Sequence, residues 1–111
     1  MLIGSLGRPI KLEDRKASFV DGMGGESVFE SMWPYVSHLV DASVTLSLRQ
    51  IADAVSLLAD RNSIVAEGAG AATLAAALSD DVPGGNIVCV ISGGNIDLMK
   101  LATIFHGDIP Q

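Results

Sequence analysis

The residues best suited to chemistry lie at the end of an apolar run, where Ile87–Ile91 is followed by Ser92, Gly93, Gly94 and Asn95. Ser92 offers a hydroxyl that can donate and accept hydrogen bonds. The two glycines allow close approach of the backbone to other atoms and tolerate positive φ in a turn. A polar turn after a strand is more often a plain connection to a helix than a ligand contact. The residue types alone therefore leave both interpretations open.

Composition limits the classes of protein that fit. The chain has 111 residues, of which 49% are hydrophobic and 18% are charged, with a net charge of −6. This length and this high hydrophobic content predict one globular domain with a hydrophobic core. The negative charge and the lack of a Lys/Arg cluster argue against a nucleic-acid partner or an anionic membrane surface.

The location and the metal content are predicted from a few residues. The single cysteine, Cys89, cannot form an intramolecular disulfide, which favours a reducing cytoplasm. The apolar run 69–78 is about half the ~20 residues that a bilayer crossing requires, and we expect no membrane span. His38 and His106 have no Cys, Asp or Glu at a spacing typical of metal ligands. No metal is expected.

Helices must position the turn formed by Ser92–Asn95. Two capping-box patterns predict where helices begin. Ser27–Glu30 and Ser47–Gln50 both have a serine followed three residues later by Glu or Gln. Apolar residues at i, i+4 and i+7 predict an amphipathic helix over 48–60. Pro34 would clash inside the first helix, so that helix either kinks or begins later, near Met32.

Two more helices are expected downstream. An alanine-rich helix follows Gly68 and Gly70 and ends near Ser79, and its small side chains allow close packing. Asp97 is a suitable N-cap for a last helix.

The strand pattern determines the predicted fold class. Ile87–Ile91 predicts a strand buried on both faces, and Ser43–Ser47 and Ile64–Ala66 are shorter candidates. Strands that alternate with helices predict an α/β fold, here a partial parallel sheet with covering helices. Residues 1–18 are expected to form an extended lead-in, and 19–111 the α/β portion. So few strands would leave apolar surface exposed, which implies a missing half or an oligomer.

Three motifs together carry a family resemblance. "FVDGMGGESVF", "VAEGAGAATLAAALS" and "VCVISGGNIDL", in that order, resemble the C-terminal part of the pyridoxal-phosphate enzymes of the threonine dehydratase and serine racemase family. The similarity extends from Phe19 to Leu101. It implies the C-terminal part of the large domain of a fold-type II enzyme, with the cofactor between two domains. Such enzymes eliminate water and then ammonia from serine or threonine, or racemise serine.

The resemblance also implies roles for single residues. Ser92 matches the family serine that hydrogen-bonds the pyridine nitrogen of the cofactor. A hydroxyl is neutral and cannot hold that nitrogen protonated by charge, so the ring becomes a weaker electron sink. Gly93 and Gly94 would let the backbone lie close to the ring, and Asn95 would brace the turn.

Two further matches lie earlier in the chain. Asp21 and Gly22 match an Asp-Gly pair near the cofactor, and Glu67 matches a glutamate close to the ring, where it could serve in a proton relay. Without the resemblance, Asp-Gly is an ordinary turn signal. A glutamate before a helix ordinarily complements the helix dipole.

Two parts of the family pattern are missing from this sequence. The lysine that forms the Schiff base lies in a Ser-x-Lys-x-Arg-Gly-like motif, and a run of four glycines holds the phosphate; neither is found here. The three lysines, Lys11, Lys16 and Lys100, lie in other contexts. We therefore expect no catalytic residue in this chain and no tight binding of pyridoxal phosphate by the chain alone.

Two functional hypotheses follow. The first is a C-terminal fragment of a threonine/serine dehydratase that supplies the pyridine side of the cofactor pocket and is inactive alone. Its expected partner is another copy of the chain or a complementary N-terminal fragment. The second is a non-catalytic oligomeric or partner-binding module that retains the sub-fold.

Overall fold

The computed structural model describes residues 9, 11, 13 and 16–111, and these fall into two units. Residues 24–45 belong to the first unit, and residues 17–23 and 46–111 form the second. The predicted lead-in, 1–18, lies largely outside the described residues. A boundary at residue 18 stays a prediction.

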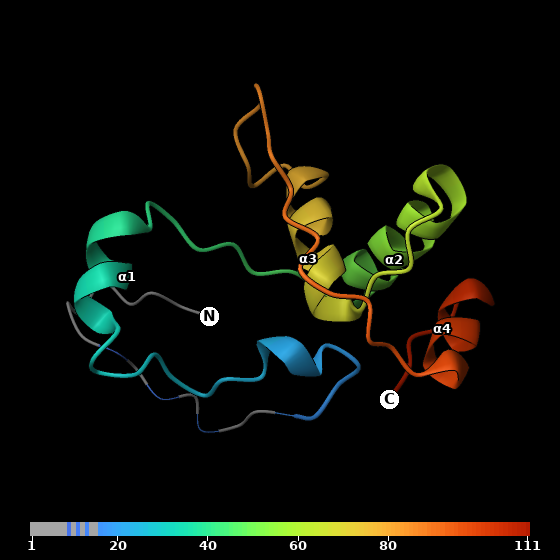
Figure 1. Cartoon of the computed structure of the whole chain (residues 1–111), viewed down its shortest axis with the longest axis horizontal. Helices are drawn as coiled ribbons and strands as arrows, with labels where there is room; N and C mark the ends of the chain where they lie inside the picture. The colour runs from blue at the N-terminus through green and yellow to red at the C-terminus, as the bar shows by residue number, and fades with distance from the viewer. Residues whose placement is uncertain (1–8, 10, 12, 14–15) are drawn as a thin grey trace. The chain divides into compact units, whose positions relative to one another are not determined.

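The first unit contains one helix, α1, Trp33–Leu39 (Figure 1). Its N-cap is Met32, and Pro34 lies in the first turn, where the missing N–H removes no helical hydrogen bond. The predicted helix start at Ser27–Glu30 is wrong, since these residues lie before the helix. The alternative start near Met32 is confirmed.

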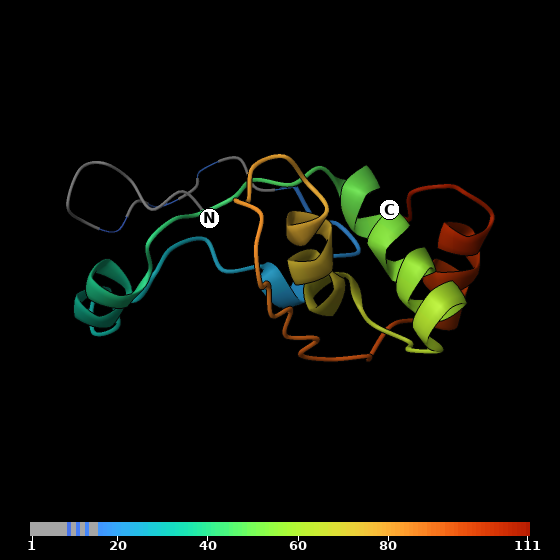
Figure 2. The ribbon, with the colours of Figure 1, turned by 90° about the horizontal axis from the view of Figure 1, so that it is seen from above.

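The second unit is built from three helices and a short 3-10 turn. They are η1, Asp21–Met23; α2, Leu48–Asn62; α3, Gly68–Ala77; and α4, Leu98–Phe105. Helix α2 contacts both α3 and α4, and η1 contacts α3 (Figure 2). The three helices that the sequence predicts in this region are confirmed, but Gly68 and Gly70 lie inside α3 rather than ahead of it.

Side-chain caps fix where α2 and α4 begin. The Gln50 N–H donates to Ser47 Oγ at 3.2 Å, and the Ser47 N–H donates to Gln50 Oε1 at 2.9 Å, which completes a capping box. Asp97 Oδ1 accepts from the N–H groups of Met99 and Lys100, at 2.8 and 3.3 Å. Both starts are thus determined by neighbouring residues in the sequence.

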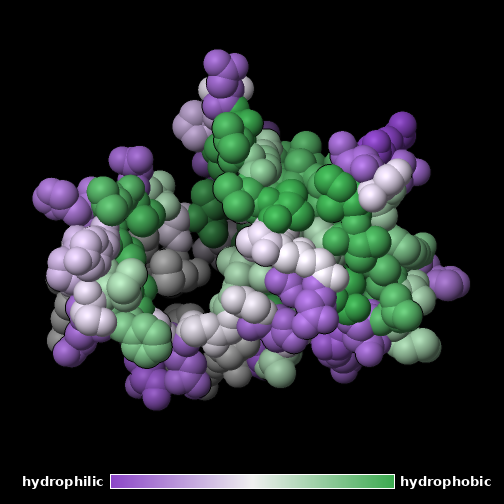
Figure 3. All heavy atoms as spheres, viewed as in Figure 1, coloured by the Kyte–Doolittle hydropathy of each residue, from purple (hydrophilic) through white to green (hydrophobic). Residues whose placement is uncertain are grey.

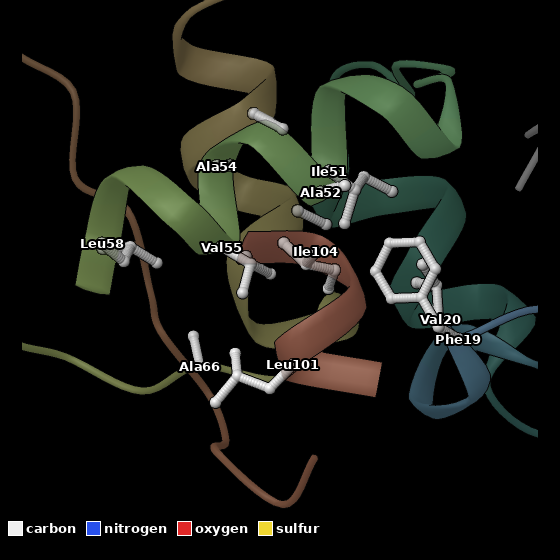
Figure 4. Close-up of a cluster of buried hydrophobic side chains, with 13 residues drawn as sticks. Phe19, Val20, Ile51, Ala52, Ala54, Val55, Leu58, Ala66, Leu101 and Ile104 are labelled. Atoms are coloured by element: carbon white, nitrogen blue, oxygen red, sulfur yellow. The ribbon is translucent and has the colours of Figure 1, made fainter. Parts of the chain in front are cut away.

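The core lies where α2 meets α3 and α4 (Figure 4). Val55, near the middle of α2, is fully buried, and Leu101 and Ile104 of α4 are buried as well. Alanines dominate the contact between α2 and α3, so the two helices can approach closely. The core consists of Phe19, Val20, Ile51, Ala52, Ala54, Val55, Leu58, Ala66, Ala71, Ala72, Ala75, Leu101 and Ile104.

The predicted sheet is not confirmed, because no strand is assigned among residues 16–111. The prediction that Ile87–Ile91 is buried on both faces is wrong, since the side chains of Val88 and Val90 are 89% and 65% exposed. Cys89 and Ile91 alternate with them and are half-buried, so only one side of the segment packs on the unit. Apolar side chains gather over the second unit in Figure 3.

We expect Ser47→Ala to lower the free energy of unfolding by about 1 kcal/mol, because it leaves the Gln50 N–H in the first turn of α2 without an acceptor. Ser47→Asp keeps an acceptor at the N-cap and should change stability much less. Urea unfolding followed by circular dichroism measures both. Equal midpoints for the Ala and Asp variants would contradict a stabilising cap.

Candidate functional site

The start of α3 is joined to the Ser92 turn by a backbone hydrogen bond. Glu67 is the N-cap of α3, and its N–H donates to the carbonyl oxygen of Gly93 at 3.1 Å. The first turn of a helix has N–H groups without helical partners. Here the chain after the Ile87–Ile91 segment lies against that end of the helix.

The Glu67 side chain lies between two of the predicted site glycines. A Cβ added to Gly93 would lie 2.5 Å from Glu67 Oε1, and one added to Gly22 would lie 3.7 Å from the same oxygen. The structure therefore brings Gly22, Glu67 and Gly93 together from three separate segments. The absence of a side chain at Gly93 leaves room for the carboxylate.

Gly70 and Thr73 of α3, which were not predicted as site residues, also contact the segment 90–93. A Cβ on Gly70 would lie 2.5 Å from the Gly93 carbonyl oxygen, and Thr73 Oγ1 donates to the Val90 carbonyl oxygen at 3.1 Å. Gly70 lies three residues from both Glu67 and Thr73, and residues three apart are neighbours on a helix surface. That spacing was the signal available in the sequence.

The rest of the turn is open to solvent. Ser92, Gly94 and Asn95 are exposed. Within the described part of the chain the Ser92 and Asn95 side chains form no hydrogen bond, so Asn95 does not brace the turn as expected. The Ile96 N–H closes it instead, by donating to the Gly94 carbonyl oxygen at 3.0 Å.

The two turn glycines are required for close packing rather than for backbone conformation. Among the described glycines, φ is positive at Gly85 and Gly107 and not at Gly93 or Gly94, so this turn does not use the tolerance of glycine for positive φ. A Cβ on Gly94 would clash with the Val65 carbonyl oxygen. Both positions thus exclude a side chain because other atoms already fill the space.

Asp21, the remaining predicted site residue, is exposed in η1, which contacts α3. A surface pocket of about 330 Å³ lies elsewhere on the second unit, and no predicted site residue lines it. Its lining consists of Gln50, Asp53, Ala54, Leu57, Ala75 and Leu78.

The described residues contain no cluster of three His, Cys, Asp or Glu side chains suited to a metal ion. None of their helices is long and apolar enough to cross a membrane.

Comparison with known proteins gives a family match over most of the chain. Residues 2–93 match the family described as pyridoxal-phosphate dependent enzyme. An L-threonine ammonia-lyase of Thermotoga maritima is 37% identical over 108 residues, which cover 95% of this chain and 27% of that protein. The L-threonine dehydratase catabolic TdcB of Staphylococcus aureus is 35% identical, over 82% of this chain and 28% of its own length.

A solved structure is similar as well. The crystal structure of a threonine deaminase from T.th. matches with a TM-score of 0.71 and 33% identity, over 82% of this chain and 31% of that chain. The fold of this chain is therefore similar to that of part of a threonine deaminase. The chain spans little more than a quarter of the length of the curated relatives it matches.

We expect Gly70→Ala to destabilise the chain by about 1–2 kcal/mol, because the new methyl group would overlap the Gly93 backbone. Helix propensity alone predicts the opposite, a gain of about 1 kcal/mol. Gly84→Ala is the matched control, since a Cβ there would meet no atom within 4 Å. Its free energy of unfolding should stay within about 0.5 kcal/mol of the wild type. A stabilised Gly70→Ala variant in urea unfolding would show that the 90–93 segment does not lie against α3.

Proposed function

The chain belongs to the pyridoxal-phosphate dependent enzyme family, and on that premise we propose that it is the C-terminal part of a threonine/serine dehydratase that supplies the pyridine side of the cofactor pocket. The observation that carries the proposal is the convergence of Glu67 and Gly93 beside the exposed Ser92 hydroxyl. The relatives named as threonine ammonia-lyase and threonine dehydratase support the choice of reaction.

The residues around the turn fit a flat, polar-edged ring. Gly93 and Gly94 present backbone without side chains, and the Ser92 hydroxyl forms no hydrogen bond to the described residues, so it is available to a ligand. The carboxylate of Glu67 lies against Gly93, next to the same surface. Gly22 of η1 lies beside Glu67, and in our proposal Asp21 and Asn95 are further residues near the cofactor.

Pyridoxal phosphate, when bound, supplies the electron sink that stabilises negative charge at the substrate carbon next to the amino group. In our proposal Ser92 Oγ hydrogen-bonds the pyridine nitrogen. Being neutral, the hydroxyl does not hold that nitrogen protonated by charge, which favours prompt loss of the β-hydroxyl group. In our proposal the Glu67 side chain, which lies beside Gly93, accepts and donates a proton at Oε1 as one member of a proton relay.

The chain lacks the lysine and glycine-run motifs of the family, so we propose that a partner provides them. A complementary N-terminal fragment would also cover the exposed Val88 and Val90 side chains, and association of two copies is the alternative. The unpaired Cys89 thiol suits a reducing compartment, and we propose a cytoplasmic enzyme.

The function is tested by mixing this chain with the part of the T. maritima ammonia-lyase that precedes the matched region, with pyridoxal phosphate added, and measuring ammonia released from threonine. Ser92→Ala should lower the rate roughly ten- to a hundredfold, because a buried ring nitrogen without its hydrogen bond costs about 1–3 kcal/mol. Ser92→Asp introduces a carboxylate that favours a protonated ring, and it should also change the absorption spectrum of the complex.

Ser31→Ala, at an exposed position in the first unit, is the control and should leave the rate unchanged. Wild-type rates for both Ser92 variants would show that Ser92 does not contact the ring. A complex without activity or cofactor binding would favour the non-catalytic module.

The chain alone should show no stoichiometric labelling of one lysine by pyridoxal phosphate and borohydride. Lys11 is exposed and pairs with Glu26 at 3.2 Å, and Lys100 lies in the first turn of α4. A reactive lysine needs a desolvated amine of lowered pKa, and such a site requires a buried setting. Mass spectrometry of the reduced adducts measures the labelling. A single lysine modified at one equivalent would contradict this expectation, whereas slow labelling spread over several would agree with it.

A further inference from the structure

We propose that Thr73 is a positioning residue, whose hydroxyl fixes the 90–93 segment along α3 so that Ser92 is presented beside Glu67. The inference rests on the proposed function only in taking Ser92 to face the cofactor. The contacts of Thr73 themselves are independent of any ligand.

Two hydrogen bonds attach the segment to the same helix at two places. At one end the Glu67 N–H donates to Gly93 O, and at the other Thr73 Oγ1 donates to Val90 O, at 3.1 Å each. Glu67 and Thr73 are six residues apart, or about 9 Å along a helix axis. Val90 and Gly93 are three residues apart, or about 10 Å in an extended chain. The two spans match, so the segment runs antiparallel to the helix between its two attachment points.

A second contact at Thr73 strengthens the same attachment. The Cys89 thiol donates to the Thr73 carbonyl oxygen, with an Sγ to O distance of 3.6 Å. Thr73 thus accepts from Cys89 through its backbone and donates to Val90 through its side chain. Adjacent residues of the segment are held by one residue of α3.

Ser92 lies between the two attachment points, and its own side chain is exposed. Gly70, midway between Glu67 and Thr73, lets the backbone of Gly93 lie directly on the helix. Without the Thr73 hydroxyl, the weak bond from the Cys89 thiol would be the one hydrogen bond left between α3 and the residues just before Ser92, beside the apolar packing of Ile91 on the core. The position of Ser92 relative to Glu67 would then vary.

The first test is amide hydrogen exchange of the 111-residue chain, with Thr73→Val, Thr73→Ser and Thr103→Val. Valine is nearly the same shape as threonine and has a similar helix propensity, so Thr73→Val removes the hydroxyl and little else. The Glu67 amide, which donates to Gly93 O, is the reporter, and its exchange should become about three- to tenfold faster, the effect of losing one typical hydrogen bond. Thr73→Ser keeps the hydroxyl and should restore the wild-type rates.

Thr103→Val is the matched control, because Thr103 Oγ1 donates to Met99 O within α4 and does not contact the 90–93 segment. It should leave exchange of the Glu67 amide unchanged. Unchanged exchange at Glu67 in Thr73→Val, or acceleration of equal size throughout α2 and α4, would overturn the proposal. If Thr73→Val does not fold, Cys89→Ala breaks the second contact and should accelerate the same amide by a smaller factor; no acceleration there would also overturn it.

The second test measures the dissociation constant of pyridoxal phosphate in the mixture with the N-terminal part of the T. maritima relative, by absorbance. Thr73→Val should raise this constant about three- to tenfold, and Thr73→Ser should stay within about twofold of the wild type. Equal constants for the Val and wild-type chains would overturn the positioning role. A wild-type mixture that binds no pyridoxal phosphate would contradict the proposed function, and the exchange rates of the chain alone would still decide the role of Thr73.

Discussion

Close packing between α2 and α3 is the constraint on which the second unit depends. Helix α4 reaches the core by contacting α2, and η1 reaches it by contacting α3, so each peripheral element is attached through one of these two helices. Ala54 of α2 and Ala71 and Ala75 of α3 are buried in this region. Larger side chains would push the helices apart and would move Glu67, which lies at the start of α3.

The same use of small residues builds the candidate site. Gly70 and Gly93 let a helix and an extended segment touch through their backbones, and the hydrogen bond from Glu67 to Gly93 fixes the contact. The site is thus shaped by where side chains are missing. Its exposed polar group, the Ser92 hydroxyl, lies at the surface of the second unit.

Local signals in the sequence predicted the helices of the second unit, and long-range signals were harder to read. The Ser47 and Asp97 caps are made by residues within three positions, so a pattern search finds them. The Ser27 pattern looks equally good, yet the helix begins after Met32, where proline can occupy the first turn. The predicted sheet could not be established because a strand needs a neighbour, and the described residues provide none for Ile87–Ile91. The hydrogen bond from Thr73 to Val90 joins residues 17 positions apart, so it depends on the fold. The sequence shows only the spacing along α3.

The exposed side of Ile87–Ile91 has a consequence for how the chain behaves while that side stays uncovered. Residues 82–96 contain no Asp, Glu, Lys or Arg, so no gatekeeper charge interrupts the β-prone stretch. Short uncharged segments of high β propensity assemble into cross-β aggregates when they stay accessible. Aggregation of such a chain is slowed when another protein covers the segment soon after synthesis. The timing of synthesis then matters as well as the folded structure.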